Sequence, residues 1–231
     1  MARKPSSTVS VLTTRLTTVG PKNKSSERPK ISQAGRQSLR IIGGEWRGRK
    51  IPFATVAGLR PTQDRVRETL FNWLAGPLPG ASCLDLFAGT GALGLEALSR
   101  GAQQVDFVDL SAIATRHLRD NLKHLPTALG QVAKVEQASS FDWLKHYKAS
   151  AASAADLPVY DLVFLDPPFA LALMQDILNA LFDSQCLASK AIIYVEQARP
   201  LTELTLPDSW HLHRSKKAGQ VFYGLISRAP S

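Results

Sequence analysis

Short apolar runs alternate with longer amphipathic stretches from residue 82 onward, which predicts an α/β fold with a parallel sheet. Each run is rich in Val, Ile, Leu or Phe, as expected for a buried strand. The predicted strands cover residues 82–87, 104–109, 132–137, 160–165 and 190–196. The predicted helices between them cover residues 91–100, 111–124, 140–148 and 170–182. Two last strands, near 210–215 and 219–227, are joined across Lys216, Lys217 and Ala218 and predict a closing hairpin.

The chain before residue 82 has a shorter pattern of its own. Residues 39–51 predict a short strand, a glycine turn and a second strand. A helix follows over residues 63–75, with Thr62 as its N-cap. Its apolar face is formed by Val66, Leu70, Trp73 and Leu74. The predicted organisation is a tail over 1–38, a hairpin and helix over 39–76 and a main domain over 77–228.

The tail differs from the rest in composition. Residues 1–40 contain nine Lys or Arg and one acid, whereas residues 41–231 contain nineteen Lys or Arg and eighteen acids. The first forty residues therefore supply nearly all of the net charge of +9. It is rich in Ser, Thr and Pro and lacks periodicity, which predicts disorder. Its prolines and the absence of an amphipathic stripe argue against a transit peptide. A basic tail suits an RNA partner, and equally a solvated extension without a role.

The remaining composition excludes several classes of protein. No apolar run approaches the length of a membrane span, and we expect no signal peptide. Cys83 and Cys186 lie in apolar segments, which predicts buried thiols in a reducing compartment and therefore a cytoplasmic protein. The histidines are not paired with cysteines at metal-ligand spacing, so we predict no metal.

A stiff elbow is predicted where the strand over 160–165 ends. Asp166 is followed by Pro167, Pro168 and Phe169, and proline donates no backbone hydrogen bond, so the sheet ladder must stop there. These groups suit methylation of an exocyclic amine on a nucleobase. Asp166 and the Pro167 carbonyl would accept hydrogen bonds from the amine, while Phe169 would stack on the base. A plain strand-terminating turn is the alternative.

A glycine-rich turn follows the strand over 82–87. Gly89, Gly91 and Gly94 match the dinucleotide-binding spacing, in which the backbone passes close to a ligand at a helix N-terminus. The match alone does not separate NAD(P) from S-adenosylmethionine. Asp85 would attract the ammonium group of a methionine moiety and repel a pyrophosphate, which favours S-adenosylmethionine.

A second acid is predicted to bind the ribose of the cofactor. Asp109 ends the strand over 104–109, eighteen residues after Gly91, where a carboxylate can accept both ribose hydroxyls. Asp106 lies on the same strand and is the other candidate. Ligands bind at the C-terminal ends of strands in open α/β sheets, which favours Asp109. A glycine turn that binds no ligand is the alternative.

Basic residues near the N-terminal hairpin suggest a nucleic-acid surface. Trp46 among arginines suits phosphate contact with base stacking, although an ordinary basic hairpin packed on the domain is the alternative. The candidate RNA-contacting residues are Arg47, Arg49, Lys50, Arg65 and Arg67, with Lys216 and Lys217 as additions.

With these motifs placed, the chain resembles the bacterial 16S ribosomal RNA (guanine-N2)-methyltransferases. The resemblance rests on residues 40–49, 59–74, 85–100, 166–169, 193–196 and 218–221, and covers about residues 39–228. It implies a Rossmann-like sheet of seven strands with the last one antiparallel, and S-adenosylmethionine as the methyl donor. It also implies direct in-line transfer to a flipped guanine. The partner would be 16S ribosomal RNA or the assembling small subunit, and we expect a monomer.

The resemblance assigns roles to individual residues. The cofactor would be held by Asp85, Phe87, Gly89, Gly91, Asp109, Arg60 and Thr62, and the guanine by Asp166, Pro167, Pro168 and Phe169. The chain departs from the family pattern in two places. Ser139 lies in a turn that usually carries Asp or Asn beside the adenine, so it is the candidate for that contact. Ser111 stands where family members often carry an acid.

Three other functions remain open on the sequence. An N6-adenine methyltransferase of DNA or RNA would use the same elbow, which serves any exocyclic amine. A non-catalytic RNA-binding or ribosome assembly factor would use the same scaffold without the cofactor. An NAD(P) oxidoreductase would use the glycine turn, although nothing downstream resembles a hydride-transfer site.

Overall fold

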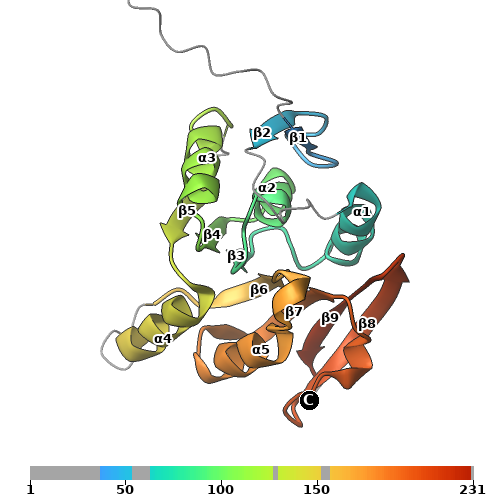
Figure 1. The fold of residues 1–231 in the computed structure, drawn as a ribbon. Coiled ribbons are helices and arrows are strands. Elements are labelled where there is room, and N and C mark those ends of the chain that lie inside the picture. Colours follow the sequence, from blue (N-terminus) through green and yellow to red (C-terminus); the bar gives the residue numbers. More distant parts are fainter. Residues whose placement is uncertain (1–36, 54–62, 127–129, 152–156, 230–231) are drawn as a thin grey trace, which may run out of the picture. The chain divides into compact units, whose positions relative to one another are not determined.

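A seven-stranded sheet forms the centre of the fold (Figure 1). The computed structural model describes residues 37–53, 63–126, 130–151 and 157–229. The strands are β3 (Ser82–Asp85), β4 (Gln104–Asp109), β5 (Val132–Gln137), β6 (Tyr160–Leu165), β7 (Leu187–Gln197), β8 (Trp210–Ala218) and β9 (Val221–Arg228), in the order β5-β4-β3-β6-β7-β9-β8. The first five are parallel, and β9 runs antiparallel to both of its neighbours. The predicted α/β fold, with seven strands and the last one antiparallel, is confirmed.

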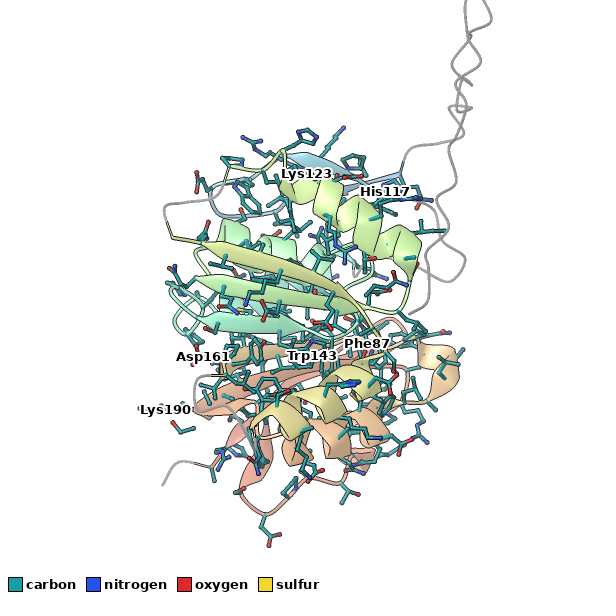
Figure 2. The ribbon with its side chains drawn as sticks, turned by 90° about the vertical axis from the view of Figure 1, so that its left-hand side faces the viewer. Phe87, His117, Lys123, Trp143, Asp161 and Lys190 are labelled. Carbon is teal, nitrogen blue, oxygen red and sulfur yellow. The ribbon has the colours of Figure 1, made fainter. Side chains whose placement is uncertain are left out.

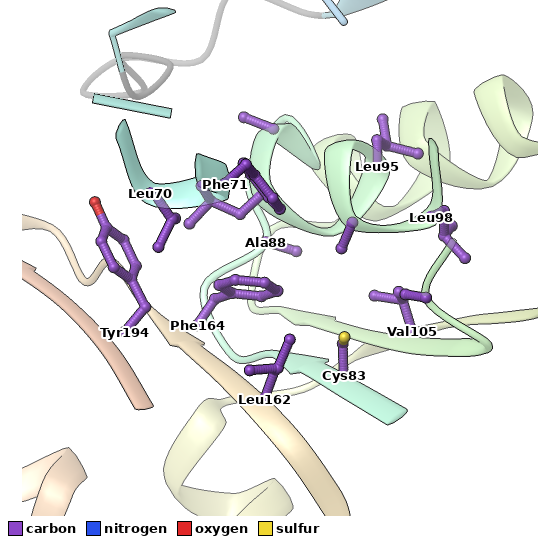
Figure 3. Packing of buried hydrophobic residues seen from close by; sticks show 14 of the residues in the cluster. Leu70, Phe71, Cys83, Ala88, Leu95, Leu98, Val105, Leu162, Phe164 and Tyr194 are labelled. Carbon is purple, nitrogen blue, oxygen red and sulfur yellow. The ribbon is translucent and has the colours of Figure 1, made fainter. Parts of the chain in front are cut away.

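Helices cover both faces of this sheet, which explains why the central strands are apolar on both sides. One face packs against α1 (Asp64–Trp73), α2 (Ala92–Ser99) and α3 (Ala112–Leu122), and the other against α4 (Ser140–Ala151) and α5 (Met174–Asp183). Figure 3 shows the first face, where Phe71 of α1 lies above Phe164 of β6 with ring centroids 6.2 Å apart. Cys83 and Cys186 are buried and free, as predicted.

The N-terminal hairpin differs in detail from its prediction. β1 (Gln37–Arg40) pairs with β2 (Lys50–Phe53). The first strand therefore begins inside the predicted tail, and both strands lie further along the chain from Gly43 and Gly44 than predicted. The glycines dock on α2 instead: a Cβ at Gly44 would lie 1.8 Å from the Ser99 carbonyl oxygen, and φ there is +74°. Only glycine permits this approach.

Trp46 is a core residue and not the stacking surface that the sequence suggested. Its side chain is 1% exposed. Its indole Nε1 donates to the Pro126 carbonyl at 2.7 Å, and its backbone N–H donates to Ser99 Oγ at 2.9 Å. The basic residues around it are exposed, but the ring itself fixes the hairpin to the domain.

Arg67 is likewise wrong as a candidate RNA contact, because its side chain is fully buried. Its guanidinium donates to the Arg40 carbonyl and to Asp64, and lies 3.5 Å from the buried carboxylate of Glu96. Glu96 in turn accepts backbone N–H groups from residues 42 and 43 and pairs with Arg100 at 2.7 Å. This buried network joins α1, α2 and the hairpin.

Other details also differ from the predictions: β3 ends two residues earlier than predicted, and β7 begins three residues earlier. β8 and β9 are joined at Gly219 and Gln220, so Lys216 and Lys217 lie within β8 rather than in the turn. The N-cap position of α1 is Gln63 rather than Thr62, which lies outside the described residues. The predicted helix over 170–182 is split into η1 (Phe169–Leu171) and α5, because Ala172 between them adopts φ +48°.

We expect Arg67→Ala to lower the free energy of unfolding by about 3 kcal/mol, because it leaves the buried charge of Glu96 with one fewer partner. The matched control is Arg65→Ala, which removes an exposed charge from the same helix and should change stability by less than about 0.5 kcal/mol. Urea unfolding followed by circular dichroism measures both. Equal stability of the two variants would contradict the structural role of Arg67.

Candidate active site

Four adjacent strands end at one edge of the sheet, and an acid lies at or just after the end of each. Asp109 ends β4, Asp85 ends β3, Asp166 directly follows β6 and Glu196 is the second-last residue of β7. The strands are parallel neighbours in the order β4-β3-β6-β7, so all four acids belong to the same edge. Figure 2 shows Phe87 near this edge, whereas Asp161 and Lys190 lie toward the opposite one.

The glycine turn between β3 and α2 is shaped by close contacts. Gly89 and Gly91 have φ of +50° and +79°, and Gly91 is the N-cap of α2. A Cβ at Gly91 would lie 2.6 Å from Leu118 of α3, and one at Gly94 would lie 2.2 Å from the Phe107 ring of β4. The first two glycines therefore set the turn, and the third lets α2 pack closely on the sheet.

Asp85 lies beneath this turn, fully buried. One of its carboxylate oxygens accepts the Gly94 N–H at 3.1 Å, which ties the end of β3 to the first turn of α2. Burial raises the pKa of Asp85 to about 7, the hydrogen bonds from Gly94 and Phe87 oppose this, and the charge of Asp109 adds to the rise. The site thus contains a carboxylate that a nearby cation would stabilise in its charged form.

Asp109 is half-buried and faces the same turn. Its carboxylate accepts the backbone N–H groups of Gly89 and Ser111, each at 2.7 Å. Ser111, one of the departures from the family pattern, is the N-cap of α3 and accepts the Ala114 N–H. Asp106 instead accepts the hydroxyl of Tyr160 at 2.6 Å, next to a cavity of about 220 Å³ that also contacts α4. Of the two acids on β4, Asp109 is therefore the one that contacts the glycine turn.

The remaining cofactor candidates are only partly described. Ser139 follows Ala138, whose N–H donates to the Asp109 carbonyl at 3.1 Å, so the serine lies beside the ribose candidate. Ser140, which the sequence did not single out, donates its hydroxyl to the Leu86 carbonyl and fixes α4 to the end of β3. Arg60 and Thr62 lie outside the described residues.

The proline elbow follows β6 as predicted. Asp166 is half-buried and Pro167 is buried, whereas Pro168 is exposed and the Phe169 ring is 40% exposed. The chain then turns at once into η1, where the Leu171 N–H donates to the Pro168 carbonyl at 3.0 Å. The elbow therefore presents an accessible aromatic ring close to a carboxylate.

Glu196 is a site residue that sequence reasoning missed. It is 5% exposed, and one of its carboxylate oxygens accepts the Tyr194 hydroxyl at 2.6 Å. Burial raises the pKa of Glu196. Burial also raises the pKa of Tyr194, and the charges of Glu196 and Asp166 add to that rise. Asp166 follows Leu165, which pairs with Val195, so Asp166 lies at the end of the strand next to Glu196. An acid closing an apolar run, the signal already used for Asp85, would have found it.

Exposed basic residues remain as candidate RNA contacts at two places. Arg47, Arg49 and Arg65 are exposed, as their predicted role requires. On β8 the structure adds a cluster, the β8 basic cluster, consisting of Arg214 and Lys216 with Trp73 of α1. The two cations lie 6.0 and 5.7 Å from the centre of the Trp73 ring. Trp73 also stacks on Tyr223 at 5.6 Å.

Two general features bear on the class of site. Across the described parts of the chain, no three His, Cys, Asp or Glu side chains are grouped so as to ligate a metal ion. None of the helices described is both long enough and apolar enough to traverse a bilayer.

Comparison with known proteins gives consistent matches along most of the chain. Residues 39–227 match the family described as "Conserved hypothetical protein 95". The Escherichia coli (strain K12) protein named "Ribosomal RNA small subunit methyltransferase D" is 44% identical over 199 residues, which cover 86% of this chain and 94% of that protein. The Haemophilus influenzae protein of the same name is 43% identical over 187 residues, covering 81% and 92%. The solved structure of yhhF from Escherichia coli has a TM-score of 0.70 and 43% identity, and covers 83% of this chain and 98% of that chain.

We expect the stability of the protein to depend on pH through Asp85. Burial raises the pKa of Asp85 from its ordinary 3.8 to about 7, so the folded protein holds this proton more tightly than the unfolded chain does. Its contribution to stability is therefore complete below about pH 4 and is lost as the pH rises to about 7. Relative to Asp85→Asn, the free energy of unfolding should fall by up to about 1.4 kcal/mol per pH unit across that window. Urea unfolding of both proteins between pH 5 and 8 measures this difference, and a constant difference would contradict it.

Proposed function

The chain belongs to the family described as Conserved hypothetical protein 95 and is a homologue of ribosomal RNA small subunit methyltransferase D, and on this premise we propose its reaction. The protein transfers the methyl group of S-adenosylmethionine to the N2 amine of a guanine in 16S ribosomal RNA. The observation that carries the proposal is the pairing of β3 with β6. Asp85 pairs with Phe164, two residues before Asp166, so the glycine turn and the elbow end adjacent strands.

The cofactor site fits S-adenosylmethionine through its charges and its backbone. Asp85 receives the ammonium group of the methionine part, because a cation there relieves the burial of its carboxylate. Gly89 and Gly91 adopt the left-handed backbone conformation, with φ of +50° and +79°, which lets the turn pass close to a ligand. Asp109 exchanges its bonds to backbone N–H groups for the ribose hydroxyls. Phe87, Ser139, Arg60 and Thr62 complete the proposed cofactor set.

The elbow acts on the amine. Bound S-adenosylmethionine supplies a methyl group on a positively charged sulfur, which is a good leaving group, so the protein chiefly orients the reactants. Asp166 and the Pro167 carbonyl accept hydrogen bonds from N2 and favour its pyramidal form. Asp166 takes the proton that N2 releases as the new N–C bond forms. Phe169 stacks on the flipped guanine, and Pro168 lines its approach.

The RNA partner is held by exposed basic residues. The β8 basic cluster is continuous with the site across the sheet, since Lys216 pairs with Tyr223 and Tyr223 pairs with Glu196. Cations against a tryptophan suit both phosphates and unstacked bases. The further proposed RNA contacts are Arg47 and Arg49 between β1 and β2, and Arg65 of α1, all of which are exposed. The partner is the 16S RNA or the assembling small subunit, met in the cytoplasm by a monomer.

We expect Asp166→Ala to lower the rate of methyl transfer by about 100-fold or more while S-adenosylmethionine binds within about threefold of wild type. Tritiated methyl transfer to small subunits that lack the modification measures the rate, and calorimetry measures the affinity. The matched control is Asp161→Asn, an exposed acid at the start of the same strand, which should keep near wild-type transfer. Transfer by Asp166→Ala at the rate of this control would refute the role of Asp166.

We expect Lys216→Ala to weaken RNA binding by about tenfold at low salt and to reduce the slope of log affinity against log salt concentration by about 1. Cofactor affinity should not change. Lys190→Ala is the control, because Lys190 is an exposed lysine toward the opposite edge of the sheet (Figure 2). Filter binding of 16S RNA across a salt series measures both variants. Equal salt slopes for the two would exclude the β8 basic cluster from the RNA surface.

A further inference from the structure

Glu196 lies directly beside the proposed catalytic carboxylate. Leu165 pairs with Val195 in parallel register, so the next residues along the two strands are Asp166 and Glu196. Neighbouring strands are about 4.8 Å apart, which is the spacing expected between the two backbones. Phe164 pairs with Tyr194, and each lies two residues before one of the acids, so Asp166 and Glu196 continue the same face of the sheet.

The Glu196 carboxylate has hydrogen-bonding capacity beyond its bond to Tyr194. A carboxylate can accept about four hydrogen bonds, and the tyrosine uses one of them. The bond to Tyr194 also holds the side chain in one orientation. A buried carboxylate at 5% exposure is costly unless further donors reach it, which points to a donor supplied by a ligand.

Guanine presents such a donor at the right position. The N2 amine is flanked by N1–H on one side and by the N3 lone pair on the other, so a base whose N2 meets Asp166 can turn its N1–H toward the neighbouring strand. Adenine differs at this point, because the ring nitrogen beside its N6 amine carries a lone pair and no hydrogen. A carboxylate held at this position attracts the N1–H of guanine and repels the N1 lone pair of adenine.

We infer that Glu196 selects guanine, by accepting the N1–H of the base whose N2 is methylated. This inference rests on the proposed function and extends it, because the elbow alone would accept any exocyclic amine. Glu196 is thus a specificity-determining residue, and Tyr194 is a positioning residue that orients it.

The test replaces the methylated guanine with 2-aminopurine, which keeps the N2 amine but has no hydrogen on N1. Small subunits are reconstituted with 16S RNA carrying either base at the position that the wild-type protein methylates. We expect the wild type to favour guanine over 2-aminopurine by about 100-fold in kcat/KM, and Glu196→Gln to reduce that ratio to below about 10-fold. The missing O6 of 2-aminopurine affects both proteins alike and cancels in the comparison.

Glu203→Gln is the control, since it neutralises an acid that is about half exposed, in η2 (Leu201–Glu203), and should keep the wild-type ratio. Calorimetry with S-adenosylmethionine checks that each variant is folded. Should Glu196→Gln fail to fold, Tyr194→Phe replaces it, and we expect it to lower the ratio at least about threefold. An equal loss of activity on both bases, with the ratio unchanged, would overturn the role of Glu196 while leaving the proposed function intact. If the wild type methylates no guanine, both the proposed function and this inference are overturned.

Discussion

The register of β6 between β3 and β7 is the constraint on which the site depends. Phe164 pairs with Asp85 on one side and with Tyr194 on the other. Because the three strands are parallel, this single row brings the acid under the glycine turn and the tyrosine beside the elbow to the same height in the sheet. A slip of one residue would turn the side chains of β6 to the opposite face and separate them.

The side chains over this row hold the register. The Phe71 and Phe164 rings lie 6.2 Å apart, and the centroids of Phe164 and Tyr194 lie 6.5 Å apart, so α1 is packed directly on the strands that carry the site (Figure 3). α1 is attached in turn through Arg67 and Glu96 to α2, which begins at the glycine turn. The buried ion pair thus links α1, which packs over the strand that leads to the elbow, to α2, which begins at the glycine turn.

The sequence predicted the positions of the strands more accurately than it predicted which residues lie on the surface. The boundaries of β4, β5 and β6 agree with their predictions because a buried parallel strand leaves a continuous apolar run between polar turns. Asp85, Asp109 and Asp166 were singled out because each closes or follows such a run, and the structure brings the three to one edge of the sheet. Trp46 and Arg67 were misassigned because their partners, Pro126 and Glu96, are distant in the chain. A basic residue in a basic stretch of sequence is predicted to be exposed when the acid that pairs with it in the core lies far away in the chain. Glu196 was overlooked as a site residue although residues 193–196 contribute to the resemblance, because no role was assigned to that stretch.

The charges at this edge explain why one protein needs both an acidic site and a basic surface. Burial is the main cause of the raised pKa values of Asp85 and Tyr194, and the negative charges of Asp109 and Asp166 add to them, so negative charge accumulates where the strands end. Such an edge suits a cationic cofactor and the N–H groups of a base, but it repels the phosphates that accompany the base. Lys216 and Arg214 lie two strands away from Glu196 and Tyr194, in the same rows of the sheet. In the proposed function, this separation would let the RNA backbone contact cations while only the uncharged base approaches the acidic edge.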